Sequence, residues 1–309
     1  MRPVRRAVLG CLWVILPSLL MGATSDSASA QITPTPTVPP HAMNFDVSDC
    51  KTCHEKAMTA FEQTHHGKIP GLCESCHGDV TNHLKSESEK GEVGTIISFK
   101  KMKPADVNKA CLTCHDKMRQ ANWMGGVHDR KSLACTTCHS VHDFKSLTAQ
   151  LKTTRDNETC FSCHPAIRAK GMRTSHHPVR EGKMGCADCH NPHDATRPKM
   201  IKAEWVNDLC YTCHAEKRGP FLWEHAPVRE NCLNCHDPHG SNHDKLLVAK
   251  LPYLCQRCHL NTRHPGSLYD FRNTIAGTNP SNRAVEHACK NCHQNVHGTN
   301  APSGPYLGR

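Results

Sequence analysis

The sequence has few of the side chains from which an ordinary hydrophobic core is built. Of its 309 residues, 37% are hydrophobic and only 5% are aromatic. After the N-terminal segment, no stretch is long and apolar enough to cross a bilayer, because the best candidate, Leu246 to Leu254, is interrupted by Lys250 and Pro252. We therefore expect no membrane-spanning helix beyond the N-terminus, and no packed core of ordinary size.

No cysteine is left over for a structural disulfide or a catalytic thiol. Of the 21 cysteines, 20 belong to ten copies of the motif Cys-x-x-Cys-His, and the remaining one, Cys11, lies near the N-terminus. The motif cysteines are Cys50, Cys53, Cys73, Cys76, Cys111, Cys114, Cys135, Cys138, Cys160, Cys163, Cys186, Cys189, Cys210, Cys213, Cys232, Cys235, Cys255, Cys258, Cys289 and Cys292.

This motif is the attachment site of c-type haem. The two thiols lie on one face of a helical turn, where they can form thioethers to the vinyl groups of one porphyrin. The adjacent histidine can then bind the iron as the proximal ligand. Zinc ribbons are the alternative, but they leave the histidine after every second cysteine unexplained. We therefore predict ten covalently bound haems c, with the proximal ligands His54, His77, His115, His139, His164, His190, His214, His236, His259 and His293.

The N-terminus has the pattern of a secretory signal peptide. A positive region (Arg2, Arg5 and Arg6) precedes a mostly apolar stretch, and Ala28-Ser29-Ala30 forms a cleavage site after Ala30. The apolar stretch is shorter than the ~20 residues of a membrane anchor, and a lipoprotein signal at Cys11 would have almost no apolar region before it. We predict a signal peptide over residues 1–30, a Pro/Thr-rich leader over 31–45 and a decahaem domain over 46–309, with motifs 1–5 in 46–182 and motifs 6–10 in 183–309. The expected compartment is the periplasm.

Motif spacing and charge complete the expected fold. The motifs recur at short, nearly constant intervals, as in repeat proteins whose units stack on their neighbours. We expect a multihaem cytochrome c that is mostly irregular coil, with short α-helices around a linear chain of ten haems and negligible β-structure. The net charge of +10 does not indicate a nucleic-acid partner, because the basic side chains are expected to pair with haem propionates.

The other histidines suit the sixth coordination position of each iron. The motifs form five pairs, and each pair has candidates between its motifs (His65 or His66, His128, His176 or His177, His225, and His264 or His287) and one after its second motif (His83, His142, His193, His239 and His297). His66, like His128 and His225, lies seven residues before the next motif, which favours it over His65. The sequence from His176 to Glu181 matches that from His225 to Glu230, which favours His176, and we take His264 for the last pair. The predicted distal ligands are therefore His66, His83, His128, His142, His176, His193, His225, His239, His264 and His297, with His41 and His243 in surplus.

Some of these ligands are expected to bind a neighbouring haem. His142, His193 and His239 each follow a proximal histidine by three residues. Two histidines so close approach from the same side, whereas the axial positions of one iron lie on opposite faces. Cross-ligation of this kind would fix the distance between successive haems.

The chain resembles the decahaem cytochromes of the MtrA/DmsE type, which include PioA and MtoA. The resemblance covers the chain after the signal peptide, and its most specific part runs from Cys210 to His259. It implies bis-histidine ligation at every haem and a position inside an outer-membrane β-barrel porin of the MtrB type. It also implies periplasmic or inner-membrane cytochromes as electron donors or acceptors, with an outer-surface multihaem cytochrome as an optional further partner.

Three functions compete at this point. The favoured one is an electron-transfer wire on the periplasmic side of an outer-membrane porin–cytochrome conduit, used for iron or other metal oxidation or reduction outside the cell. The second is a soluble periplasmic shuttle to a terminal reductase such as a sulfoxide reductase. The third is a nitrite- or hydroxylamine-type enzyme, which would need an open iron position. Because ten distal candidates match ten motifs, we expect no enzyme and no catalytic residue.

Overall fold

A computed structural model of the chain describes residues 47–69, 71–85, 96–259, 288–302 and 304–308. The chain divides into two units, Met1–Pro39 and Pro40–Arg309, and the first of these lies outside the described residues. Because the described residues begin at Val47, the predicted signal peptide (1–30) and leader (31–45) also lie outside them. Among the helices of the described ranges, none has the length and apolarity needed to span a membrane.

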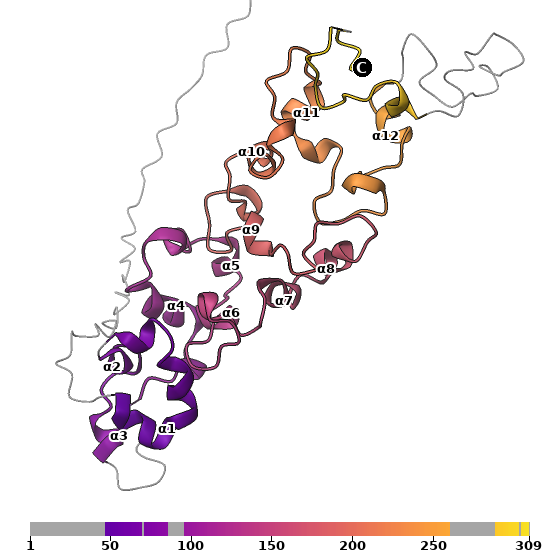
Figure 1. Ribbon diagram of the computed structural model, residues 1–309. Coiled ribbons are helices and arrows are strands. Elements are labelled where there is room, and N and C mark those ends of the chain that lie inside the picture. The colour runs from indigo at the N-terminus through magenta and orange to yellow at the C-terminus, as the bar shows by residue number, and fades with distance from the viewer. Residues whose placement is uncertain (1–46, 70, 86–95, 260–287, 303, 309) are drawn as a thin grey trace, which may run out of the picture. The chain divides into compact units, whose positions relative to one another are not determined.

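The described residues form short helices joined by irregular segments (Figure 1). The longest, α1, has 15 residues and is kinked at His54. The α-helices are α1 (Val47–Phe61), α2 (Leu72–His77), α3 (Thr81–Lys85), α4 (Pro104–Leu112), α5 (Val127–Arg130), α6 (Cys135–Cys138), α7 (Asp156–Phe161), α8 (Pro165–Gly171), α9 (Cys186–Cys189), α10 (Val206–Tyr211), α11 (Ala226–Glu230) and α12 (Tyr253–Gln256). The 3₁₀ turns are η1 (His66–Lys68), η3 (Phe99–Lys101), η4 (Met118–Gln120), η5 (Thr148–Gln150), η6 (Pro198–Met200), η7 (Ala215–Lys217), η8 (Cys232–Asn234), η9 (Asp244–Leu246) and η10 (Cys289–Asn291).

No strand occurs in the described part of the chain, where β-pairing is limited to isolated bridges. The bridges join His139 with Leu151, Ser146 with Leu151, Ser175 with Ser241, His190 with Ile201, Trp223 with Thr299, and His236 with Leu247. The predicted fold class, a coil-rich multihaem fold with short helices and negligible β-structure, is confirmed.

The unit Pro40–Arg309 has little packed apolar core. Among the described residues, the buried hydrophobic side chains are Met58, Phe61, Val80, Val107 and Trp123. A cavity of about 5550 Å³ instead lies within this unit, and its lining residues extend from Asp49 to Leu307. An ordinary ligand pocket has about 300–1,000 Å³. The chain therefore encloses room for several porphyrin-sized groups, as expected if haem supplies the buried apolar mass.

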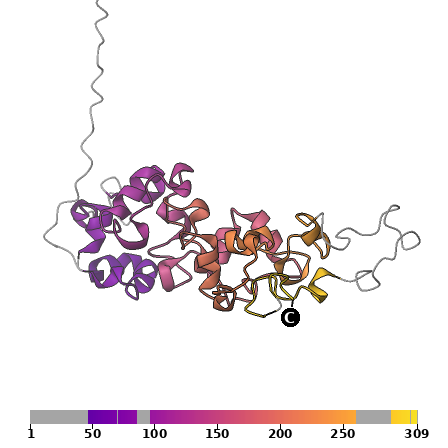
Figure 2. The ribbon, with the colours of Figure 1, turned by 90° about the horizontal axis from the view of Figure 1, so that it is seen from above.

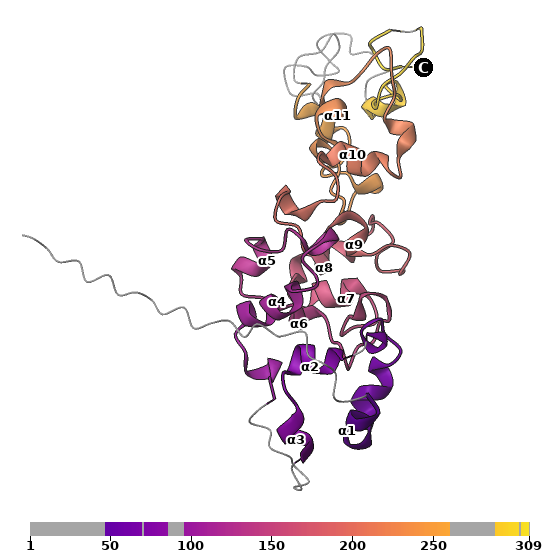
Figure 3. The same cartoon turned by 90° about the vertical axis from the view of Figure 1, so that its left-hand side faces the viewer.

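Within this unit, backbone contacts join each of two motif pairs to the pair that follows it in the chain. Figure 3 shows α10 and α11 beside the yellow C-terminal residues, and in Figure 2 the orange and yellow segments again lie together at one end of this unit. Ser175 and Ser241 exchange two backbone hydrogen bonds, and Trp223 and Thr299 do the same. Each exchange joins a segment that precedes a second motif to one in the next motif pair. Neighbouring pairs are thus held together directly.

Candidate functional site

Each motif includes a helical turn. The helices α6, α9, η8 and η10 begin at the first cysteine of their motif, whereas those of the other motifs begin before it. In eight motifs, from Cys111 to His293, the backbone N–H of the histidine donates to the carbonyl of the first cysteine at 2.9–3.0 Å. The first two motifs lie inside α1 and α2. This turn brings the two thiols to one face, and the histidine closes the turn directly after them, as the motif predicts.

The histidines of the first and second motif of a pair have different backbone conformations. His164 and His214, from first motifs, have ψ values of 59° and 49°. His139 and His190, from second motifs, are extended, with ψ values of 150° and 143°. The alternation makes the structural repeat a pair of motifs rather than a single motif.

A buried asparagine connects the two motifs of a pair. Asn108 lies three residues before Cys111, and its Oδ1 accepts a hydrogen bond of 2.7 Å from the N–H of Cys135. Its side-chain amide donates to the carbonyl of Leu133 at 2.9 Å. Asn207 repeats this arrangement before Cys210, accepting from the N–H of Cys232 at 2.8 Å.

The middle pair uses a variant of this connection. Asn157 donates to the carbonyl of Val179 at 3.2 Å, and the neighbouring Asp156 accepts from the N–H of Ala187 at 2.7 Å. Sequence reasoning missed these residues, although an asparagine three residues before the first cysteine recurs in three pairs.

Within each pair, the first cysteines of the two motifs are neighbours. A hydrogen bond with Cys135 raises the pKa of Cys111 above its usual value. Burial and the Cys73 thiol raise the pKa of Cys50 to about 11. The other neighbouring first cysteines are Cys160 with Cys186, Cys210 with Cys232, and Cys255 with Cys289.

Between pairs, it is the second cysteines that interact. Burial raises the pKa of Cys138, and the nearby Cys163 of the next pair adds to this. The corresponding neighbours are Cys76 with Cys114, Cys189 with Cys213, and Cys235 with Cys258. Together with the contacts inside pairs, these neighbours link all ten motifs into one uninterrupted series.

Nine motif histidines each face a second histidine across a gap. The distances between ring centroids are 5.8–6.4 Å. The pairs are His54–His83, His77–His142, His115–His66, His139–His193, His164–His128, His190–His239, His214–His177, His236–His297 and His259–His225.

This separation suits one metal ion between two imidazoles. An imidazole nitrogen binds a transition metal at about 2 Å, and the ring centre lies about 1 Å behind that nitrogen. Two rings on opposite sides of one iron should therefore have centres about 6 Å apart. The nine pairs fit two axial ligands of a haem, with the thiols of the same motif beside them.

The motif histidines that close each pair are oriented by backbone carbonyls. His139 Nδ1 lies 2.6 Å from the carbonyl oxygen of Ala149, and His190 Nδ1 lies 2.8 Å from that of Lys199. The corresponding contacts of His77, His236 and His293 are with Ile97, Lys245 and Tyr306. A ring whose Nδ1–H is donated to a carbonyl presents Nε2 to a metal, the arrangement typical of metal-binding histidines.

The loops that provide these carbonyls share an unusual backbone. Ala149, Lys199 and Lys245 have φ values of 62°, 56° and 56°. A non-glycine residue with positive φ is uncommon, and it turns the chain sharply. Here the turn aims the carbonyl back at the motif histidine in three successive repeats.

The opposing histidines are oriented across the boundary between pairs. His128 Nδ1 lies 3.0 Å from the carbonyl of Pro192, just before His193. His177 and His225 make the same contact with Pro238 and Val296, just before His239 and His297. His66 uses the Gln150 side chain instead, at 2.8 Å.

Adjacent pairs therefore exchange histidines reciprocally. The histidine between two motifs faces the first motif of the next pair, and the histidine after the next pair faces the second motif of the preceding one. His128 thus faces His164 while His193 faces His139. His142, His193 and His239 all lie opposite a motif histidine of the neighbouring pair, in the arrangement that their spacing predicts.

Burial keeps several of these rings neutral. Burial, followed by the nearby His139, lowers the pKa of His193 to about 4. Burial and then Lys217 lower the pKa of His297 to about 4. Neutral imidazole is the form that binds a metal.

One predicted distal histidine lies elsewhere. His177, and not His176, faces His214. His176 points to Glu181, with its Nε2 3.1 Å from Oε1, and this hydrogen bond lowers the pKa of Glu181 to about 2.

Backbone register explains the difference. His177 lies two residues after the bridge at Ser175, just as His225 lies two residues after the bridge at Trp223. The sequence match aligns His176 with His225, whereas the bridges place His177 at the position that corresponds to His225.

The remaining candidates are placed as follows. His66, and not His65, faces His115. His41, His264 and His287 lie outside the described residues. His243 is described, and its backbone N–H donates to Ser241 Oγ at 3.0 Å.

Comparison with known proteins gives two family matches. A doubled CXXCH motif matches residues 176–219 and 225–264, and a cytochrome c-type NrfB-like protein family matches residues 73–153.

Three characterised relatives are also similar. Multiheme cytochrome MtrA of Shewanella baltica (strain OS185) is 41% identical over 276 residues, which cover 84% of this chain and 80% of the relative. Cytochrome c-type protein NrfB of Escherichia coli O6:H1 is 26% identical over 37% of this chain and 63% of its own. The high-molecular-weight cytochrome c of Nitratidesulfovibrio vulgaris is 26% identical over 50% of this chain and 27% of its own.

Proposed function

The chain belongs to the family of multihaem c-type cytochromes that includes MtrA, and on this premise we propose that it is a decahaem electron conduit through the outer membrane. It is an electron-transfer protein that binds haem c covalently through paired Cys-x-x-Cys-His motifs. Beyond this, we propose how many haems the chain binds, which residues hold each iron, which protein is the partner, and that electrons cross the outer membrane.

Ten haems are proposed because all ten motifs are equivalent in sequence and adjoin one another. The motif cysteines would hold each porphyrin by thioethers, and the motif histidine would hold its iron. The proposed distal ligands are His83, His142, His66, His193, His128, His239, His177, His297 and His225, in motif order, followed by His264 or His287 for the last haem.

The protein's part in electron transfer is to position and insulate the irons. Haem iron supplies the one-electron chemistry when it is bound. The asparagine connections fix the two motifs of a pair, and the exchanged histidines fix one pair against the next. Because two axial histidines would leave no open iron position, we propose that the protein is not an enzyme.

One observation carries the proposal of a continuous wire. Thiol neighbours alternate, first cysteines inside pairs and second cysteines between pairs, without a gap from Cys50 to Cys289. An enzyme or a storage protein does not need such continuity, whereas stepwise electron transfer does.

A barrel partner follows from the chain's irregular backbone. Such backbone is tolerated at membrane depth only where another protein shields it. If the wire crosses the outer membrane, it must lie inside a closed β-barrel, and we propose an MtrB-like porin as this partner. Export by a signal peptide over residues 1–30 would bring the decahaem domain, residues 46–309, to the periplasm. There, other cytochromes would exchange electrons with one end, and extracellular iron or another metal, directly or through a surface cytochrome, with the other.

The proposal can be tested with liposomes that enclose a redox dye. With a membrane-impermeant reductant outside, cytochrome plus barrel should reduce the dye, and either component alone should not. A barrel loaded with cytochrome that lacks haem is the matched control for leakage. If the cytochrome never binds a barrel, yet rapidly reduces a soluble periplasmic enzyme, the shuttle function replaces the conduit.

A further inference from the structure

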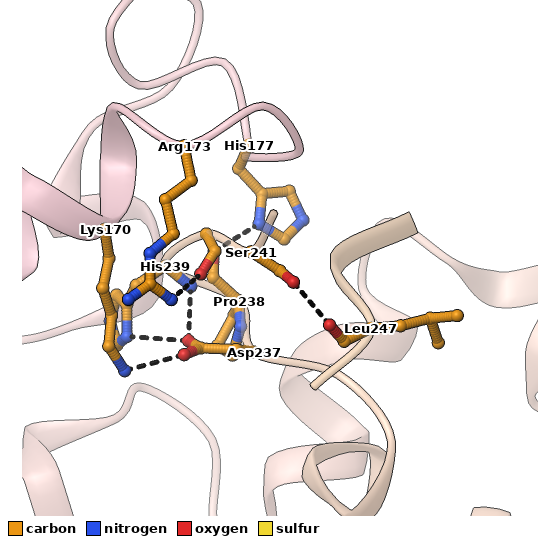
Figure 4. A network of polar contacts seen from close by, with 9 residues as sticks. Lys170, Arg173, His177, Asp237, Pro238, His239, Ser241 and Leu247 are labelled. Atoms are coloured by element: carbon orange, nitrogen blue, oxygen red, sulfur yellow. Dashed lines mark hydrogen bonds and ion pairs between the residues drawn. The ribbon is translucent and has the colours of Figure 1, made fainter. Parts of the chain in front are cut away.

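One motif pair is joined to its neighbour by two partly exposed charged side chains that lie beside a histidine pair. Lys170, in α8, places its Nζ 2.7 Å from Asp237 Oδ2, and 19% of the Asp237 side chain is exposed. Figure 4 shows the Asp237 carboxylate in contact with both Lys170 and His239. His239 faces His190, with ring centroids 6.1 Å apart and an interplanar angle of 11°.

Asp237 acts on the His239 ring through its charge. Its Oδ1 lies 3.7 Å from His239 Nδ1 and accepts a hydrogen bond of 3.1 Å from the His239 backbone N–H. The contact with the ring is longer than the 2.7–3.2 Å of an N–H···O hydrogen bond. The backbone contact holds the carboxylate in place, and the ring feels a negative charge at close range.

The acidic residue occurs at this position once. Directly after the histidine of the second motif, the five pairs have Gly78, Ser140, Asn191, Asp237 and Gln294. Asn191 makes a similar backbone contact, accepting from the His193 N–H at 3.3 Å, and His193 Nδ1 is buried without a hydrogen-bond partner in the described structure. The Asn191 site therefore has the same local geometry with a neutral side chain.

We propose that Asp237 lowers the reduction potential of the haem held by His190 and His239, and that Lys170 partly opposes this effect. The proposal rests on the axial ligation proposed above. A ferric haem carries one more positive charge than a ferrous haem, so a nearby carboxylate favours the ferric state and a nearby ammonium favours the ferrous state. Because the site is partly shielded from water, these interactions are stronger than in bulk solvent. Charge and hydrogen bonding around the axial ligand are recognised ways to tune a haem.

This haem would be the sixth of ten along the chain. Every electron that travels the whole series must occupy it. Its potential therefore sets the height of one step in the path, and Asp237 and Lys170 adjust that step without changing a ligand.

Redox titrations followed by electron paramagnetic resonance test the proposal on the full ten-haem protein. In Asp237→Asn, one of the ten components should move to higher potential, because asparagine keeps the backbone contact and removes the charge. In Lys170→Met, the same component should move to lower potential. We expect a change of up to about tenfold in the ratio of reduced to oxidised haem, which corresponds to about 59 mV for a one-electron couple.

Asn191→Asp is the matched control, and it should lower the potential of a different component. Unchanged potentials in all three variants would overturn the proposal. Shifts of the same sign in Asp237→Asn and Lys170→Met would also overturn it, because they would indicate a structural disturbance rather than charge. Should Asp237→Asn fail to mature, the other two variants still decide the question.

Failure of the ligand assignment would look different. It would appear in the unmodified protein as a high-spin ferric signal, or as fewer than ten haems. Ten low-spin haems without the predicted shifts would overturn the effect of Asp237 alone and leave the proposed function standing.

Discussion

Single histidines define the proposed iron sites, and the choice between His176 and His177 is the sharpest case. The sequence favours His176 because its surrounding word matches that of His225, whereas the structure turns His177 toward His214. Both ring nitrogens of His176 already have partners, at Arg173 and Glu181. A sequence pattern cannot reveal this, because the register is decided by the bridge between Ser175 and Ser241, 66 positions apart in the chain.

The substitution His177→Ala should convert about one haem in ten from low-spin to high-spin. The alanine removes one proposed axial ligand from the iron held by His214, and the adjacent His176 ring is held by its contacts with Arg173 and Glu181. Electron paramagnetic resonance of the ferric protein measures the change. The neighbouring His176→Ala is the control and should stay fully low-spin; a high-spin signal from His176→Ala alone would restore the assignment based on the sequence.

At the scale of elements, the motif turns could be predicted but the connections between them could not. Cysteine and histidine spacing specifies ten helical turns, and all ten form as expected. The buried asparagines were not predicted, because their hydrogen-bond partners lie more than twenty positions away in the chain. Only the three-dimensional structure shows Asn108 reaching across 27 positions to the Cys135 backbone.

Asn108→Ala should destabilise the first half of the protein. Asn108 is 2% exposed, and its removal leaves the N–H of Cys135 and the carbonyl of Leu133 without their partner. Leaving a buried polar group unsatisfied costs about 1–3 kcal/mol. Thermal unfolding followed by haem absorbance should show a lower Tm. Asn122→Ala, at an exposed turn position, is the control; equal Tm values for the two variants would argue against the connecting role.

Gly240 provides a second test of the contacts between pairs. Its φ is 139°, and a Cβ at this position would lie 2.0 Å from the carbonyl oxygen of Lys170. Gly240→Ala should therefore force α8 and the segment after His236 apart. Gly125, with a φ of 75° and open space around it, is the control for backbone strain alone.

We expect Gly240→Ala to lose about 1–3 kcal/mol more than Gly125→Ala, the usual cost of overpacking. Chemical denaturation of the two variants measures the difference. Indistinguishable stabilities would show that the chain absorbs the extra methyl group and that the close approach to Lys170 is unimportant.

For the whole molecule, the haem content organises the fold. Few apolar side chains are buried in the described structure, and a large cavity passes the motif residues. The scarcity of aromatic residues predicted this outcome. The reciprocal exchange of histidines was only partly predictable: spacing indicates that a ligand crosses to a neighbouring haem, but the partner of each ring depends on contacts between pairs. Because each pair binds residues of the next, loss of one haem should disturb its neighbours.

Ten bis-histidine haems in one uninterrupted series are the central claim of this account. The most direct test is quantitative electron paramagnetic resonance of the fully oxidised protein, with haem counted by the pyridine haemochrome assay and by intact mass. We predict ten covalent haems per chain, all ferric and low-spin. Eight or fewer haems in fully matured protein, or a high-spin signal equal to one haem per chain, would contradict the claim.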